Sequence, residues 1–190
     1  PQWRPRPAST PAANATDPEQ PTLLYAGRIE EGKGAAELLR FVERYRDDRE
    51  VDAQLWLMGE AAMELPDAPW IHPLGFVSEE EKRRRLAEAT LLVAPSRLES
   101  FGIVLLEAAV AGTPSLANGA SEAYVEHCRD GHCGLYYEDY DEFAEALDLL
   151  LSDAKLRRSL ARDGDAYVRG KYSWEAVAGA YDVFLRELFG

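Results

Sequence analysis

Two glutamates bracket an apolar run in the stretch ESFGIVLLE, with Glu99 at its start and Glu107 at its end. Eight residues of continuous helix would separate the two carboxylates by roughly 12 Å along the axis, so they could not share one proton. A carboxylate accepts two hydrogen bonds well, and two separated acids therefore suit the binding of hydroxyl pairs on a polyol. We expect Glu99 in a loop and Glu107 in the following helix. The alternative is structural, with Glu107 a partly buried, paired acid and Glu99 an ordinary acid at a helix entry.

A second candidate group lies in GRIEEGKG, where Gly27, Arg28, Lys33 and Gly34 directly follow an apolar run. Two cations and three glycines beside a helix N-terminus favour an anion, because exposed amides and the helix dipole both attract negative charge. The spacing is neither that of a P-loop nor that of G-x-G-x-x-G. A solvated surface loop is an equal alternative. The stretch NGASEAYVEH is a weaker third candidate, with amides at 119–121.

The elements that must position these loops alternate along the chain. Short apolar runs rich in β-forming residues alternate with amphipathic or apolar segments of helical spacing. We predict a doubly wound, Rossmann-like α/β fold, in which a parallel sheet has helices on both faces and ligands bind beyond the carboxyl ends of the strands. Ser78 is the expected N-cap of one helix and Gly112 the expected end of another. The expected strands are 22–27, 53–59, 70–75, 90–96, 113–118 and 134–137, and the expected helices are 35–45, 78–89, 101–112, 121–128, 141–153, 153–170 and 173–188.

The ends and the composition of the chain limit its organisation. Residues 1–21 are rich in Pro, Ala, Ser and Thr and are predicted to be a linker, so we expect one domain over 22–190 and a longer parent protein. The net charge of -13 would repel a phosphate backbone, and no nucleic-acid partner is expected. No run approaches the roughly 20 apolar residues of a membrane span, and no leader is evident. Two cysteines suit a reducing compartment, and we expect a cytoplasmic location.

Three stretches together resemble the C-terminal domain of retaining family 4 glycosyltransferases of the GT-B fold. They are GRIEEGKG, the run from HPLGFV to GTPSLA, and DGHCGLYY. The resemblance covers nearly everything from Leu23 onward, and the E-x7-E segment with its following Gly-Thr-Pro is its most specific part. It implies a binding site for a nucleoside diphosphate sugar such as a UDP- or GDP-hexose, and transfer of the hexosyl group with retention.

The resemblance also implies roles for particular residues. Arg28 and Lys33, in the loop that begins at Gly27, would hold the donor diphosphate, and with Glu99 they are the catalytic candidates. Glu107 would take the ribose hydroxyls. No metal cofactor is expected, because the two cations and the helix amides would neutralise the leaving diphosphate.

Further contacts are implied at the sugar and at the base. Glu99 and the amides of Phe101, Gly102 and Ile103 would contact the transferred sugar. Val77 is the expected main-chain contact of the base, and Lys82 is expected nearby. The loop NGASEAY departs from the family pattern of two adjacent glycines and a Pro-Glu pair, which leaves its donor contacts undefined.

The expected partner is an absent N-terminal GT-B domain that supplies the acceptor pocket. We expect the chain alone to bind donor without turnover, and expect any membrane contact to be made through that other half. Two alternatives stay open, namely another GT-B enzyme such as an epimerase or a phosphorylase, and a non-catalytic α/β interaction domain.

Two further features have competing interpretations. His127, Cys128, His132 and Cys133 are all metal-ligand types, but their spacing matches no usual zinc pattern, and we favour a turn at 129–131 with a small buried cysteine. The apolar side chains of the last helix are expected in the core, with an interdomain contact as the alternative. They include Trp174, Tyr181 and Phe184.

Overall fold

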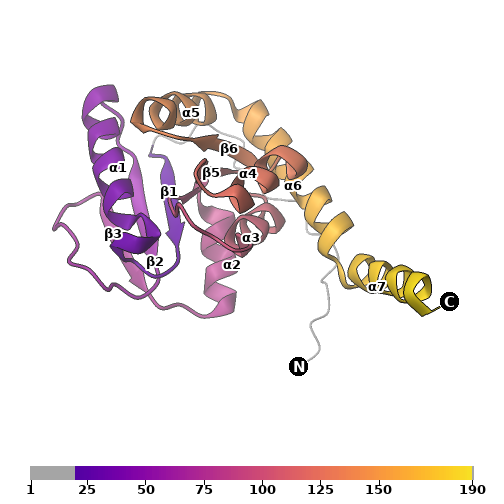
Figure 1. The fold of residues 1–190 in the computed structure, drawn as a ribbon. Helices are drawn as coiled ribbons and strands as arrows, with labels where there is room; N and C mark the ends of the chain where they lie inside the picture. Colours follow the sequence, from indigo (N-terminus) through magenta and orange to yellow (C-terminus); the bar gives the residue numbers. More distant parts are fainter. Residues whose placement is uncertain (1–19, 190) are drawn as a thin grey trace.

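The computed structural model describes residues 20–189 and has a parallel sheet of six strands with helices on both faces (Figure 1). The predicted doubly wound α/β fold is confirmed. Most of the predicted linker, residues 1–19, lies outside the described residues. The strands, in the order β3-β2-β1-β4-β5-β6, are β1 (Thr22–Ala26), β2 (Gln54–Met58), β3 (Ile71–Gly75), β4 (Leu91–Ala94), β5 (Ser115–Asn118) and β6 (Gly134–Tyr137).

The helices follow the predicted alternation and end close to the predicted residues. Gly112 ends α3 in the left-handed conformation, as predicted. The helix itself begins at Ile103, two residues later than predicted, because Gly102 is its left-handed N-cap. The helical elements are η1 (Glu31–Lys33), α1 (Ala35–Arg49), α2 (Glu79–Glu88), α3 (Ile103–Ala111), α4 (Glu122–Gly131), α5 (Tyr140–Ser152), α6 (Ala154–Tyr172) and α7 (Trp174–Phe189).

The strand order places a topological switch between β1 and β4. The chain runs outward from β1 through β2 to β3 and then returns to β4 on the other side of β1. In the register, Leu23 lies opposite Leu91 and Leu24 opposite Leu92. In open parallel sheets, ligands bind where the strand order reverses, so the loops after β1 and β4 are the expected binding loops.

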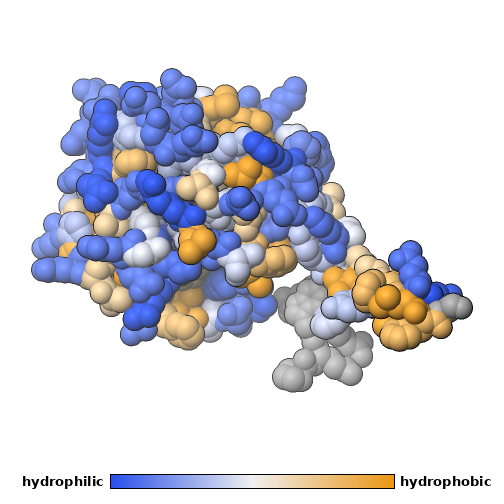
Figure 2. Space-filling model, viewed as in Figure 1, coloured by the Kyte–Doolittle hydropathy of each residue, from blue (hydrophilic) through white to orange (hydrophobic). Residues whose placement is uncertain are grey.

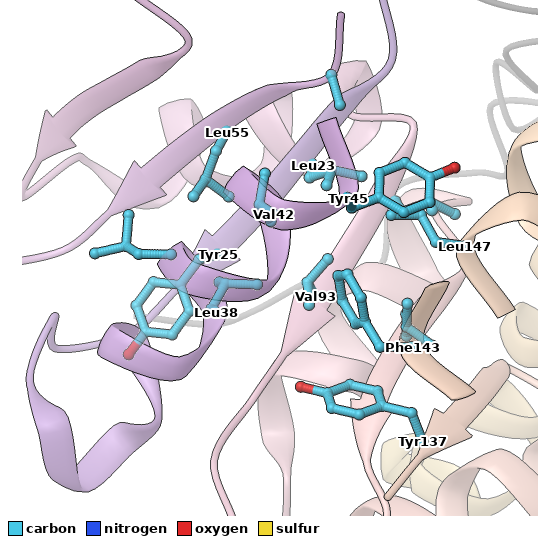
Figure 3. Packing of buried hydrophobic residues seen from close by; sticks show 14 of the residues in the cluster. Leu23, Tyr25, Leu38, Val42, Tyr45, Leu55, Val93, Tyr137, Phe143 and Leu147 are labelled. Carbon is cyan, nitrogen blue, oxygen red and sulfur yellow. The ribbon is translucent and has the colours of Figure 1, made fainter. Parts of the chain in front are cut away.

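The core consists of two layers because neighbouring strand residues point to opposite faces of the sheet. Leu23 packs in the layer with α1 and α5, whereas Leu24 packs in the layer with α2, α3 and α4. Burial on both faces explains why the strands are almost continuously apolar. Figure 3 shows part of the first layer, in which Tyr45 and Phe143 meet edge to face with ring centroids 6.4 Å apart.

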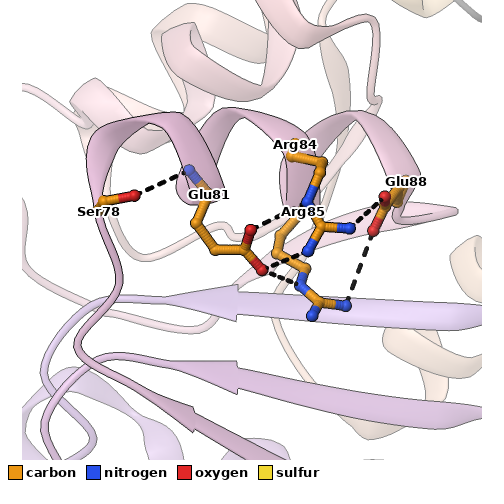
Figure 4. A network of polar contacts seen from close by, with 5 residues as sticks. All are labelled: Ser78, Glu81, Arg84, Arg85 and Glu88. Atoms are coloured by element: carbon orange, nitrogen blue, oxygen red, sulfur yellow. Dashed lines mark hydrogen bonds and ion pairs between the residues drawn. The ribbon is translucent and has the colours of Figure 1, made fainter.

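Helix α2 is held by its cap and by ion pairs along its surface (Figure 4). Ser78 Oγ accepts a hydrogen bond from the Glu81 amide at 3.2 Å, which confirms the predicted N-cap. The Glu81 carboxylate accepts from Arg84 at 2.6 Å and from Arg85 at 2.8 Å. Much of the basic run at 82–85 is therefore neutralised within its own helix.

Helix α7 extends away from the body of the domain, and its start lies next to α6 (Figure 1). None of its described residues is buried, and Trp174, Tyr181 and Phe184 are 68%, 64% and 54% exposed. The core assignment of this apolar face was therefore wrong. Figure 2 shows the apolar side chains gathered on the projecting helix. Within residues 20–189, no helix combines the length and the apolar character needed to cross a membrane.

Candidate functional site

A cavity of about 200 Å³ lies at the switch point, between the loop after β1 and the loop after β4. Close backbone contact keeps the two loops together. Gly34, at φ +76°, would place a Cβ only 2.5 Å from the Pro95 carbonyl oxygen, so a side chain there would force the loops apart. Six of the predicted donor-site residues line this cavity, namely Gly27, Arg28, Lys33, Glu99, Gly102 and Ile103.

A second cavity of about 440 Å³ adjoins the first and shares Gly27, Arg28 and Ile103 with it. It extends toward the loop between β3 and α2. Val77 and Glu107, the remaining predicted contacts of the nucleoside end, line it, and Phe76 at its edge is 94% exposed. The two cavities together form one extended groove of the kind that an elongated ligand requires.

Each of the two cations predicted for the diphosphate is paired with an acid. Lys33 Nζ lies 2.9 Å from Glu99 Oε1, with the side chains 40% and 22% exposed. Arg28 pairs less closely, with its Nε 3.3 Å from Glu30 Oε2, and its side chain is 61% exposed. Both cations therefore face the groove with an acid beside them.

Glu107 is held by a second lysine at the other end of the groove. Lys82 Nζ donates to Glu107 Oε1 at 2.6 Å. The second carboxylate oxygen, Oε2, is buried and has no hydrogen-bond partner among the residues that the structure describes. A carboxylate oriented by one cation and left with an unused acceptor is suited to hydroxyl groups.

The first turn of α3 presents backbone donors to the same groove. The amides of Gly102, Ile103 and Val104 have no hydrogen-bond acceptor within residues 20–189. Gly102 adopts φ +73°, and a Cβ there would lie 2.9 Å from Cδ1 of Tyr124. Only glycine therefore fits this N-cap, and free amides at the positive end of the helix dipole favour an anion.

Two tyrosines of the site were not predicted from the sequence. Tyr25 donates from its hydroxyl to the Arg28 carbonyl oxygen at 2.6 Å and so fixes the loop after β1. Burial, reinforced by the nearby Glu99 charge, raises the pKa of both Tyr25 and Tyr124, so both phenols remain protonated well into alkaline pH. Tyr124, on α4, gives no local signal, because its place in the cavity depends on packing across the sheet.

Phe101 occupies a different place from the other predicted contacts. Its ring lines neither part of the groove but a neighbouring apolar cavity of about 410 Å³ between α2, α3 and α6. A sugar contact by this residue would have to come from its backbone amide. Arg28, Lys33, Glu99 and Glu107 are brought together, whereas the Phe101 side chain is not.

The histidine and cysteine cluster of α4 is a packed end of a helix. Cys128 and Cys133 are buried free thiols, and His127 is buried and hydrogen-bonded. The predicted buried cysteine is confirmed, although the predicted turn at 129–131 is the last part of α4. No group of three or more His, Cys, Asp or Glu side chains within 20–189 is placed to hold a metal ion.

Comparison with known protein sequences gives a consistent family. Residues 8–166 match the protein family described as glycosyl transferases group 1. The chain is 30% identical over 177 residues to the lipopolysaccharide core biosynthesis glycosyltransferase LpsE of Rhizobium meliloti, covering 87% of this chain and 50% of that protein. It is 32% identical to a D-inositol 3-phosphate glycosyltransferase of a Nocardioides species, covering 97% of this chain and 46% of that protein. The chain spans about half the length of these curated relatives.

Solved structures share the fold. Sucrose-phosphate synthase from Thermosynechococcus elongatus superposes with a TM-score of 0.73 at 25% identity, over 94% of this chain and 49% of that one. HepE from Anabaena, solved with UDP and glucose, gives a TM-score of 0.74 at 18% identity, over 88% of this chain and 48% of that one. The C-terminal domain of the group 1 protein LpcC from Francisella tularensis gives 0.68 at 25% identity and is covered over 87% of its length.

Proposed function

Because the chain belongs to the glycosyl transferases group 1 family, we propose that it is the domain that binds the nucleoside diphosphate sugar in a retaining hexosyltransferase. The observation that carries this proposal is the groove at the switch point. One continuous groove holds two cations, the free amides of a helix N-terminus and two separated carboxylates. These are the groups that a diphosphate between two sugars requires.

The diphosphate would lie at the narrower end of the groove. Arg28 and Lys33 would neutralise the charge that develops on it as the bond to the sugar breaks, and the amides of α3 would add hydrogen bonds. Glu99, beside Lys33, would accept hydrogen bonds from the transferred hexose. When the ligand binds, the ammonium group of Lys33 would leave Glu99 and form an ion pair with the phosphate instead.

The nucleoside would occupy the wider end. Glu107, oriented by Lys82, would accept a ribose hydroxyl at its unused oxygen after a small rotation of the carboxylate. The base would lie against the main chain at Val77, beside the exposed ring of Phe76. The ligand would thus span both cavities.

The pocket for the acceptor would be supplied by a second half of the protein. The relatives are about twice as long as the matched part, and α7 carries an apolar face with no cover within residues 20–189. We propose that this face packs against an N-terminal domain that completes the cleft. The chain by itself would then bind donor without turning it over.

The test is calorimetric titration of this chain with UDP, GDP and ADP and with their glucose and mannose forms. UDP is the first probe, since the similarly folded HepE was solved with UDP and glucose. We expect one base to bind selectively, and Arg28→Ala and Glu107→Ala each to weaken that binding about tenfold or more, the loss expected for hydrogen bonds to charged groups. A folded sample that binds none of these ligands would contradict the proposal.

A further inference from the structure

We infer that His127 is a positioning residue, which holds the backbone at Phe101 and thereby aims the free amides of α3 at the diphosphate and sugar of the donor. The inference rests on the proposed function for the identity of the ligand. His127 itself lines neither part of the groove, and it acts through the backbone that it holds.

The first contact is made to the loop. His127 is 2% exposed, and its Nε2 lies 2.7 Å from the carbonyl oxygen of Phe101, the residue just before the N-cap Gly102. A carbonyl can only accept a hydrogen bond, so Nε2 must carry the hydrogen. Helix α4, through His127, therefore fixes the peptide that leads into α3.

The second contact sets the orientation of the ring. His127 Nδ1 lies 3.1 Å from the hydroxyl oxygen of Tyr167 on α6. With the hydrogen on Nε2, the neutral ring accepts at Nδ1 and Tyr167 donates. Lys171 Nζ, 3.2 Å from the same hydroxyl, can then donate to its oxygen. The Tyr172 hydroxyl, 3.2 Å from that of Tyr167, then donates to it as well, and this series of hydrogen bonds is consistent with an Nε2–H imidazole.

Ring contacts also restrict the side chain of Phe101. The Phe101 ring meets His127 edge to face at 5.6 Å and meets Tyr172 in the same manner at 5.6 Å. A Cβ at Gly102 would also lie 3.4 Å from Cδ2 of His127. The carbonyl and the ring of Phe101 are thus both held by one cluster, directly before the N-cap from which the Ile103 amide follows.

The test compares ligands that reach different ends of the groove. UMP, UDP and UDP-glucose, or the corresponding ligands of whichever base binds, are titrated into the chain and into His127→Phe, His127→Gln and Tyr167→Phe. Phe keeps a ring and loses the donor, whereas Gln keeps an N–H that reaches the carbonyl. His132→Asn is the matched control, because His132 is an exposed histidine that follows the same helix and adopts φ +46°, which Asn tolerates.

A positioning role predicts a selective loss. We expect His127→Phe to lower the affinity for UDP and UDP-glucose about tenfold, the cost of misplaced charge-assisted hydrogen bonds, and to change UMP binding less than twofold. His127→Gln should recover most of that loss, Tyr167→Phe should show a smaller selective loss, and the control should match the unmodified chain. A uniform loss for all three ligands in folded variants, or no loss at all, would overturn the inference.

A separate readout does not depend on the proposed function. In NMR spectra of the chain without nucleotide, we expect the Nε2–H tautomer for His127. We also expect order parameters at Gly102 and Ile103 to fall from about 0.85 toward 0.6 in His127→Phe, or in Tyr167→Phe if the first variant does not fold. Unchanged order in the variant, or the Nδ1–H tautomer, would overturn the positioning role. Failure of every nucleotide to bind, with these signatures present, would contradict only the proposed function.

Discussion

Lys82 Nζ lies 2.6 Å from Glu107 Oε1, and these two side chains, from α2 and α3, line the wider part of the groove. Their side chains are 24% and 30% exposed, so the pair is only partly screened by water. Glu107 is thus oriented before any ligand arrives, with its second oxygen left to accept a hydrogen bond.

This pair predicts strongly coupled effects on nucleotide binding. We expect Glu107→Ala to weaken binding of the selected nucleoside diphosphate by about 10- to 100-fold. Lys82→Met should weaken it less, because the carboxylate remains but is no longer oriented. The double variant should bind no more weakly than Glu107→Ala alone, since Lys82 acts through Glu107. Calorimetric titration of all four proteins measures the cycle, and losses that simply add would show that Lys82 contacts the ligand independently.

The pairing of Lys33 with Glu99 predicts substitutions with opposite signs. Lys33→Ala removes a cation and should weaken UDP binding about tenfold. Under the proposed function, Glu99→Gln removes a carboxylate that would compete with the diphosphate for Lys33, and it should strengthen UDP binding by about two- to fivefold, the scale of a partly exposed ion pair. Glu37→Gln is the matched control, because Glu37 pairs with Arg97 at 2.8 Å and lines neither part of the groove. A loss of UDP affinity in Glu99→Gln would contradict the competition.

The sequence was sufficient for the alternation of elements and for the loops that carry the site. These features depend on residues close together in the sequence, such as the cap at Ser78 and the glycine at the end of α3, and could therefore be predicted. The link between Lys33 and Glu99, which are 66 residues apart, follows from the strand order and has no local signal. The placement of α7 also could not be predicted, because an apolar helical face looks the same whether its cover lies within this chain or in another domain.

The start of α2 offers a test of which polar contacts stabilise the fold. Ser78→Ala removes the side-chain acceptor of the Glu81 amide and should lower the free energy of unfolding by about 1 kcal/mol. Arg84→Ala removes two ion pairs, to Glu81 and Glu88, but the Arg84 side chain is 52% exposed, so the loss should stay below about 0.5 kcal/mol. Urea unfolding monitored by circular dichroism gives both values. The reverse order would mean that the surface network outweighs the cap.

Buried tyrosines predict a loss of stability at alkaline pH. Burial raises the pKa of Tyr25, Tyr45 and Tyr124. In Tyr45 the Asp148 carboxylate, which accepts a hydrogen bond from the hydroxyl, raises the pKa further. An unfolded chain releases these protons near pH 10, whereas the folded chain keeps them to higher pH. The free energy of unfolding should therefore be unaffected by these groups below about pH 9 and should fall as the pH rises above about 10. Thermal unfolding followed at pH 8, 9, 10 and 11 checks this, and an unchanged midpoint up to pH 11 would contradict it.

The exposed face of α7 predicts substitutions that change association but leave the fold intact. Tyr181 and Phe184 are more than half exposed, so replacing both by serine should move the unfolding midpoint by less than about 2 °C, as expected away from a core. Leu147→Ala, at a fully buried position of α5, is the contrast and should cost about 2 to 5 kcal/mol. An apolar surface left uncovered also drives self-association, so sedimentation velocity should show less concentration-dependent association in the double serine variant. A large loss of thermal stability in that variant would mean that α7 packs on the domain in solution, and the face would then be part of this chain's own core.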